Sequence, residues 1–329
     1  MNKADYYNKL IAINNESDFE NLALEVFQLQ AKSNKVYSEF IKNLGVSISA
    51  IMEVNQIPFL PVEIFKSRKV LTGDDTHQLI FTSSGSTGEN VSRHFVKDVG
   101  FYEKIFSETF KKFYGEVNEY TILALLPSYL ERQGSSLVFM MVKLIEHSHH
   151  SESGFYLNDF EKLYETLKRL KERKQKTILF GVTFALLDFV ASFHLDFREL
   201  IVMETGGMKG RRKELVREEV HENLRRGFGV RSIHSEYGMT ELLSQAYSSG
   251  NGVFQTPPWM RVVIRDTSDP LFQTGIDASG GINIIDLANI DSCAFIATQD
   301  LGKIYSDNTF EVLGRFDFSE VRGCNLLVD

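Results

Sequence analysis

Short apolar runs alternate with longer helical patterns between about residues 79 and 247, and this alternation restricts the fold more than any other feature. Each run is followed by a loop that contains glycine or proline, and the runs cover residues 79–82, 121–126, 177–180 and 200–203. Such alternation predicts an α/β fold in which helices pack on sheets. Ligands bind where the strands of such sheets open into loops, so these loops are the first candidates for a site.

The sequence on either side of this region has a different pattern. Residues 5–55 are expected to be helical, because Ser17 and Glu20 have the spacing of a capping box and apolar residues follow on one stripe. From residue 251 onward, short strand-like runs separated by turn residues replace the helical periodicity. We therefore predict a helical prelude and α/β core over residues 1–250, and a small β-rich subdomain over residues 251–329.

The charge and the cysteine content exclude several classes of protein. A net charge of −8 provides no field that would attract nucleic acid or an anionic membrane surface. The polar N-terminus and the short apolar runs predict neither a signal peptide nor a membrane span. Two cysteines, Cys293 and Cys324, are too few for a disulfide framework and fit a reducing compartment. We expect a cytoplasmic protein that holds any polyanion locally.

The strongest local signal is a loop of five hydroxyl side chains and two glycines that follows the run at residues 79–82. Glycines allow the backbone to approach a ligand closely, and amide and hydroxyl donors together suit phosphate oxygens. A polar surface loop is the alternative, and the Walker pattern is absent. The predicted phosphate-binding residues are Thr82, Ser83, Ser84, Gly85, Ser86, Thr87 and Gly88.

A second signal is the segment 234–241, which contains a tyrosine, a glycine, a threonine and a glutamate in close succession. We predict a strand-to-helix transition here, in which Thr240 either caps a helix begun by Glu241 or places its hydroxyl on a phosphate. In the functional interpretation the Glu241 carboxylate is also a ligand for Mg²⁺.

Two strand ends near the C-terminus, each with a charged residue, form the third signal. Asp300 follows an apolar run, and a carboxylate there is suited to accept both hydroxyls of a ribose. Arg315 follows another run in the segment 314–317. An acidic turn residue is the more ordinary explanation for such an aspartate.

Together these segments resemble motifs of the adenylate-forming superfamily, which includes acyl- and aryl-CoA ligases, luciferases and peptide-synthetase adenylation domains. Four segments match the superfamily in its order: 82–88 its phosphate loop, 237–241 its Tyr-Gly-x-Thr-Glu motif, 299–302 its ribose motif and 314–317 its hinge motif. A closer resemblance is to the acyl-protein synthetase (LuxE-like) branch, the fatty-acid-activating component of luminescence-type fatty acid reductases. It is carried by LPSYLERQGSSL, ETGGMKGRR, HSEYGMTELLSQAY and VRGCNLLVD.

The resemblance implies a fold like the N-terminal domain of adenylate-forming enzymes, with ATP and Mg²⁺ as cofactors. It implies that two glycines line the adenine pocket, that Thr240 meets the α-phosphate, and that Asp300 and Arg315 hold the ribose. From the residues alone, the glycine pair fits equally a turn into the next helix. The other positions assigned to the nucleotide are Gly206, Gly207, Tyr237 and Gly238.

The chain also departs from the superfamily pattern. The phosphate loop often continues with Pro-Lys, whereas Glu89 and Asn90 stand here. The sequence ends at residue 329, shortly after the hinge motif, so the mobile C-terminal domain and its catalytic lysine are expected to be absent. The cation that replaces this lysine is expected among four residues, with Lys209 preferred because it lies in a predicted site loop. The alternative is that all four are solvated charges: Arg93, Lys97, Lys209 and Arg211.

The expected reaction joins a fatty or aromatic carboxylic acid to AMP and then transfers the acyl group to a thiol. In the acyl-protein synthetase branch the acceptor is a cysteine near the C-terminus, which corresponds to Cys324, although an inert strand residue is the alternative. Expected partners are an acyl-CoA-reductase-like protein or an acyl carrier. Two other functions remain open, namely an aryl- or acyl-CoA or carrier-protein ligase, and a protein that binds acyl-adenylate or nucleotide without turnover.

Overall fold

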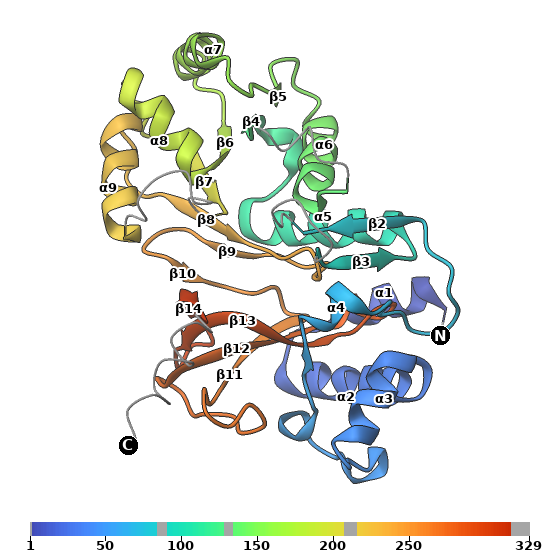
Figure 1. Ribbon diagram of the computed structural model, residues 1–329. Coiled ribbons are helices and arrows are strands. Elements are labelled where there is room, and N and C mark those ends of the chain that lie inside the picture. The colour runs from blue at the N-terminus through green and yellow to red at the C-terminus, as the bar shows by residue number, and fades with distance from the viewer. Residues whose placement is uncertain (1, 84–90, 128–133, 207–215, 317–329) are drawn as a thin grey trace, which may run out of the picture.

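The computed structural model describes residues 2–83, 91–127, 134–206 and 216–316 (Figure 1). A largely parallel sheet has the strand order β5-β4-β6-β7-β8-β9, and only β9 is antiparallel to its neighbour. The adjacent strands β4 and β6 are buried along their whole length, as expected for strands covered on both faces. The strands are β4 (Thr121–Leu125), β5 (Gly154–Phe155), β6 (Thr177–Val182), β7 (Ile201–Thr205), β8 (His234–Tyr237) and β9 (Ala246–Ser248).

Helices cover this sheet on two sides. In Figure 1, α8 and α9 lie on one side of it, and α5 and α6 lie on the other. Within the described residues no helix is long and apolar enough to cross a membrane. The helices of this region are α5 (Val99–Tyr114), α6 (Ser136–Ser148), α7 (Phe160–Glu172), α8 (Thr183–Ser192) and α9 (Arg217–Phe228).

A second, mainly antiparallel sheet contains the C-terminal strands in the order β10-β14-β13-β12-β11. A short strand from the N-terminal half, β1 (Leu60–Pro61), pairs with β13 in parallel. The strand-like runs predicted after residue 251 are therefore strands, while the division of the chain at residue 250 stays a prediction. The strands are β10 (Val253–Phe254), β11 (Met260–Arg265), β12 (Ser279–Asp286), β13 (Phe295–Ile304) and β14 (Phe310–Arg315).

The N-terminal helices pack against the second sheet and do not form a separate unit. They are α1 (Lys3–Ile11), α2 (Glu16–Ser33) and α3 (Lys35–Asn43). In Figure 1, α2 and α3 lie below the second sheet. Gln30 is fully buried and bonds to the carbonyls of Asn289 (2.8 Å) and Ile290 (3.1 Å) and the N–H of Ala294 (2.9 Å). The start of α2 differs from the prediction, because Asn15 rather than Ser17 is the N-cap and accepts from the Asp18 N–H.

The hairpin of β2 (Leu79–Thr82) and β3 (Arg93–Val96) is a two-stranded sheet of its own. The run at residues 79–82 is thus a strand as predicted, but it does not join the parallel sheet. In Figure 1 the hairpin lies between the two large sheets, and the short helix α4 (Ile64–Ser67) lies below it. The predicted phosphate loop therefore leaves the fold where its two layers meet.

Candidate functional site

The β2–β3 hairpin holds the base of the hydroxyl-rich loop. Two hydrogen bonds close it, from the Ser83 N–H to the Ser92 carbonyl (3.1 Å) and from the Ser92 N–H to the Ser83 Oγ (3.0 Å). The Thr82 N–H donates to the Gly134 carbonyl at 2.8 Å, and Phe81 is buried among aromatic rings. The other predicted phosphate ligands lie outside the described residues: Ser84, Gly85, Ser86, Thr87 and Gly88.

Thr240 and Glu241 occupy a turn between β8 and β9, so the prediction that a helix begins at Glu241 is wrong. The Leu242 N–H donates to the Met239 carbonyl at 3.1 Å, and the chain then returns alongside β8 as the antiparallel strand β9. Pairing with the edge of the sheet gives this segment its backbone partners, and a helix would forgo them. Thr240 is therefore no helix cap, and a phosphate here would not meet a helix N-terminus.

Three side chains from distant parts of the chain hold the Thr240–Glu241 turn. His94 Nδ1 lies 2.8 Å from the Thr240 carbonyl oxygen, and Asn289 Nδ2 donates to the Glu241 carbonyl at 2.8 Å. The Ser92 hydroxyl donates to the Glu241 carboxylate. A carbonyl only accepts, so Nδ1 of His94 carries the proton. None of the three was predicted from the sequence, since His94 is 146 positions from Thr240 and no local pattern marks the contact.

Burial and hydrogen bonding set the charge of these groups. Burial lowers the pKa of His94 to about 4, although the bond to Thr240 acts in the opposite direction, so the ring is neutral near pH 7. Burial raises the pKa of the Glu241 carboxyl, while the bond from Ser92 and the positive charges of Arg315 and Lys66 counteract this rise. A further positive charge near Glu241 would therefore stabilise its ionised carboxylate.

Glu241 is the candidate ligand for Mg²⁺, and its surroundings fit that role. Among the described residues, no group of three or more histidine, cysteine, aspartate or glutamate side chains could hold a metal ion. Mg²⁺ does not require such a cage, because it is commonly bound by one or two carboxylates together with substrate phosphates. A single carboxylate beside the β2–β3 hairpin is therefore a sufficient protein contribution.

Asp300, Tyr237 and Arg315 meet in space, although they come from three different sequence motifs. The Tyr237 hydroxyl donates to Asp300 Oδ2 at 2.8 Å, and Arg315 Nε donates to Asp300 Oδ1 at 3.2 Å. Asp300 and Arg315 also face each other in the β13–β14 ladder. The Arg315 side chain is 73% exposed, whereas that of Asp300 is 10% exposed. The carboxylate is therefore fixed, and it keeps lone pairs that can accept from ligand hydroxyls.

The ends of β7 and β8 carry a second buried carboxyl. The Thr205 hydroxyl donates to Glu236 Oε2 at 2.6 Å, and burial raises the pKa of Glu236 to about 7 despite this bond. A Cβ atom at Gly238 would lie 2.4 Å from Glu236 Oε1, so a larger residue there would displace the end of this side chain. Gly206 has φ +70°, a conformation that favours glycine. Gly207 lies outside the described residues.

The structure separates the four cations that were candidates for the positive charge of the adenylation step. Lys97 Nζ lies 2.6 Å from Asp74 and is already paired. Arg93 is exposed on β3, opposite Thr82 at the base of the loop. The preferred residue Lys209, together with Arg211, lies outside the described residues.

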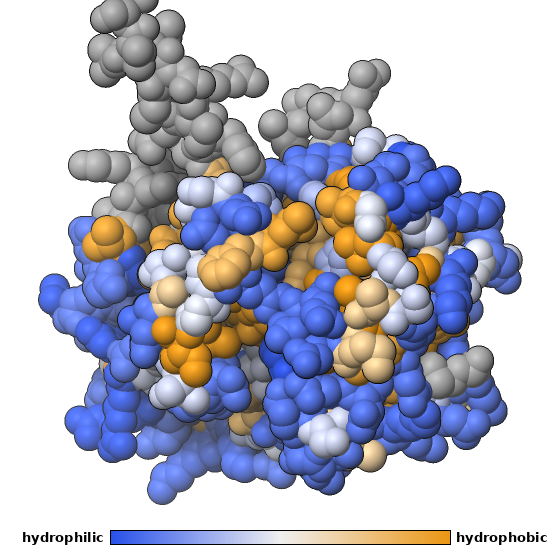
Figure 2. Space-filling view, turned by 90° about the horizontal axis from the view of Figure 1, so that it is seen from below, coloured by the Kyte–Doolittle hydropathy of each residue, from blue (hydrophilic) through white to orange (hydrophobic). Residues whose placement is uncertain are grey.

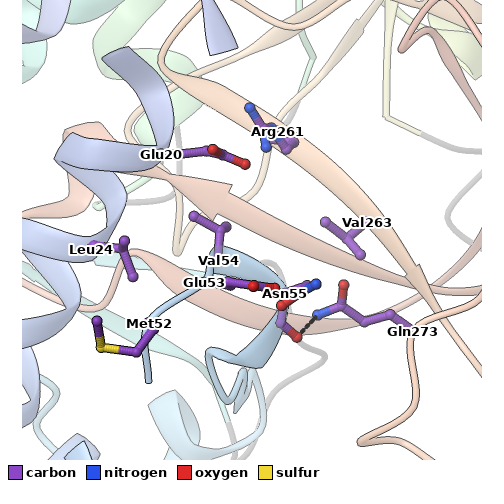
Figure 3. A pocket seen from close by; sticks show the side chains of 9 residues that line it. All are labelled: Glu20, Leu24, Met52, Glu53, Val54, Asn55, Arg261, Val263 and Gln273. Carbon is purple, nitrogen blue, oxygen red and sulfur yellow. Dashed lines mark hydrogen bonds between the residues drawn. The ribbon is translucent and has the colours of Figure 1, made fainter. Parts of the chain in front are cut away.

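A cavity of about 370 Å³ lies between α2 and β11, away from the motif residues (Figure 3). Arg261 on its wall donates to Glu16 at 2.8 Å, and Gln273 donates to the Asn55 carbonyl at 2.9 Å. The underside of the molecule is mainly hydrophilic, with separate apolar patches (Figure 2). Because none of the motif residues lines this cavity, we place the candidate site at the motifs instead.

Comparison with known proteins gives a consistent result. The family model described as "Acyl-protein synthetase, LuxE" matches residues 11–329. The long-chain-fatty-acid–luciferin-component ligase of Vibrio harveyi is 23% identical over 333 residues, which cover 91% of this chain and 84% of the relative.

Solved structures share the fold. ATP-bound MatB from Rhodopseudomonas palustris has a TM-score of 0.53 and 16% identity over 72% of this chain, which spans only 47% of that structure. An open 2-hydroxyisobutyryl-CoA ligase in complex with 2-HIB-AMP and CoA has a TM-score of 0.64 and 10% identity, covering 92% of this chain and 75% of the ligase. The likeness confirms the predicted α/β fold of adenylate-forming enzymes.

Proposed function

The chain belongs to the acyl-protein synthetase (LuxE) family, and from this premise we propose that it activates a fatty acid with ATP as an acyl-adenylate and transfers the acyl group to a thiol. The observation that carries this proposal is the convergence of the family's motif residues. Tyr237 and Arg315 both bond to Asp300, while the β2–β3 hairpin bonds to the Thr240–Glu241 turn. The name of the Vibrio harveyi relative favours a long-chain fatty acid over an aromatic acid.

In the first half-reaction, a carboxylate oxygen of the substrate attacks the α-phosphorus of ATP and pyrophosphate leaves. The loop at residues 82–88 would bind phosphate oxygens, and the Thr240 hydroxyl would donate to the α-phosphate. The Asp300 carboxylate would accept from the ribose hydroxyls, and Gly206 and Gly207 would lie beside the adenine. Since two anions must meet, catalysis depends mainly on positioning and on stabilisation of negative charge. Mg²⁺ held by Glu241 would neutralise part of the phosphate charge.

In the second half-reaction, a thiolate attacks the acyl carbonyl, the carbon–sulfur bond forms, and AMP leaves. Of the two cysteines of the chain, Cys293 is fully buried, and burial raises the pKa of its thiol to about 12. Such a thiol is a poor nucleophile. We therefore assign the acceptor role to Cys324, which lies outside the described residues. An acyl-CoA-reductase-like protein or an acyl carrier would then receive the acyl group.

Pyrophosphate exchange tests the first half-reaction. We expect exchange of labelled pyrophosphate into ATP that depends on both Mg²⁺ and a fatty acid, with weaker exchange for aromatic acids. Absence of exchange across a broad panel of acids would refute the proposal, and exchange with aromatic acids alone would replace the substrate.

Intact-mass analysis tests the second half-reaction. After incubation with ATP and fatty acid, we expect the wild-type protein and Cys293→Ala to gain the mass of one acyl group. Cys324→Ser should retain pyrophosphate exchange but gain no acyl mass. An acylated Cys324→Ser protein would exclude this cysteine as the acceptor.

A further inference from the structure

One residue, His94, connects the short helix α4 to the Thr240–Glu241 turn. Phe65 of α4 is fully buried, and its ring meets that of His94 edge-on with the centroids 6.0 Å apart. His94 in turn bonds to the Thr240 carbonyl at 2.8 Å. The position of α4 relative to the turn is thus fixed by rigid, buried rings.

The preceding segment ties α4 to the strand that carries Asp300. The Val62 N–H donates to the Ala297 carbonyl at 2.9 Å, which continues the pairing of β1 with β13. Glu63 Oε1 then accepts from Gln299 Nε2 at 2.6 Å, one residue before Asp300. The helix is therefore attached both to the Thr240–Glu241 turn and to β13.

Lys66 is the cation that this arrangement brings to the site. It follows Glu63 by three residues, so on a helix the two side chains lie on the same face, toward β13. It is only partly exposed, and in the described part of the chain its ammonium group makes no hydrogen bond or ion pair. Two other lysines are different, because Lys69, which follows α4, donates to the Asp75 carbonyl, and Lys97, which follows β3, is paired with Asp74.

The charged groups around Lys66 would be balanced by an anionic ligand. Lys66 and Arg315 are the two positive charges that act on the Glu241 carboxylate. Arg315 is itself paired with Asp300, whereas Lys66 has no carboxylate of its own within bonding distance among the described residues. A cation held beside a carboxylate, without a partner of its own among the described residues, suits a phosphate chain.

We propose that Lys66 is a catalytic residue of the adenylation step and that its ammonium group contacts the pyrophosphate as it leaves. The inference rests on the proposed function. As the substrate oxygen bonds to the α-phosphorus, the bond from this phosphorus to the bridging oxygen breaks, and its electron pair remains on pyrophosphate. Lys66 stabilises this growing charge and keeps its proton. It thereby supplies the charge that no lysine provides after the phosphate loop, where Glu89 and Asn90 stand.

The test compares Lys66→Met, Lys66→Arg and the control Lys69→Met in fatty-acid-dependent pyrophosphate exchange. Removing a group that stabilises transition-state charge lowers kcat by about 10²–10³. We expect a loss of this order for Lys66→Met with little change in KM for the fatty acid. Lys66→Arg should retain more activity than Lys66→Met, and Lys69→Met should match the wild type. Thermal unfolding of each variant should show that the fold is kept.

Two outcomes would overturn the inference while the proposed function stands. One is a Lys66→Met enzyme that exchanges pyrophosphate with a kcat within about two-fold of the wild type. The other is a variant whose only defect is a higher KM for ATP, because Lys66 would then bind ATP equally in ground and transition states. Absence of exchange by the wild-type protein with every acid would refute the proposed function and this inference together.

Discussion

His94 is a buried ring whose neutral form supports the site. It is 1% exposed, it packs edge-on against Phe65, and its Nδ1–H holds the Thr240 carbonyl. Protonation would place a charge where solvent cannot reach it, and this cost lowers its pKa to about 4. The same residue thus links the turn to α4 and makes the stability of the fold sensitive to acid.

The acid sensitivity can be measured. In the unfolded chain His94 binds a proton below about pH 6.5, whereas in the fold it does so only near pH 4, so lowering the pH through this range favours unfolding. At about 1.4 kcal/mol per pKa unit, the full effect is about 3 kcal/mol. We expect chemical denaturation at pH 7 and pH 4.5 to show this loss in the wild type and a smaller one in His94→Asn.

Two replacements of His94 distinguish the contribution of its hydrogen bond from that of its packing. The amide nitrogen of asparagine can occupy the position of Nδ1, whereas that of glutamine reaches farther. His94→Asn should therefore retain more pyrophosphate exchange than His94→Gln at pH 7. Equal pH dependence of stability in the wild type and His94→Asn would contradict the role assigned to the buried ring.

The β8–β9 turn depends both on contacts within its own segment and on contacts with distant residues. Its glycine lies close to a side chain of β8, since a Cβ atom at Gly238 would lie 2.4 Å from Glu236 Oε1. Its acidic end is held by Ser92 and Asn289. The turn therefore depends on the β2–β3 hairpin and on the turn after β12 for its position.

Gly238→Ala should destabilise the protein by about 0.5–1.5 kcal/mol, because the new methyl group forces the Glu236 carboxyl away from Thr205 and weakens their hydrogen bond. If this clash is the cause, the substitution should cost much less in a Glu236→Ala background. A double-mutant cycle by chemical denaturation measures the difference. Additive effects of the two substitutions would show that Gly238 is required for another reason.

At the scale of the whole molecule, the N-terminal helices support the site through the second sheet. Gln30 on α2 bonds to the carbonyls of Asn289 and Ile290, and the Asn289 side chain donates to the Glu241 carbonyl. Asp286, also buried, accepts from the backbone N–H groups of Leu243 and Ser244 just after the turn. The first 45 residues thus take part in the same framework as the motifs.

Gln30→Leu should test this support. It leaves two buried carbonyls and one buried N–H without their partner, and each such group costs about 1–3 kcal/mol. We expect a loss of at least about 3 kcal/mol in the free energy of unfolding, together with reduced pyrophosphate exchange. The matched control is Gln28→Leu on the same helix, whose single bond to the Ile48 carbonyl is only partly buried. Similar losses in the two variants would contradict a special role for Gln30.

The sequence by itself predicted the strands that lie on apolar runs, the order of the motifs and the family, because apolar runs, turn residues and motif spacing are local properties. It placed Asp300, Arg315 and Tyr237 in one site only through the resemblance, and the hydrogen bonds among these three residues fit that placement. It was wrong about the start of α2 and about a helix at Glu241. In both places the local sequence is compatible with two backbone conformations, and only one of them fits the rest of the fold.

The tertiary structure alone decided which residues surround the Thr240–Glu241 turn. Ser92, His94 and Asn289 reach it from two other elements, and Lys66 comes from a helix that carries no motif. Whether a histidine is neutral, or a lysine lacks a partner of its own, depends on burial and on charges brought from distant parts of the chain. Those contacts are set by the packing of the two sheets against each other, and no local pattern of residues contains that information.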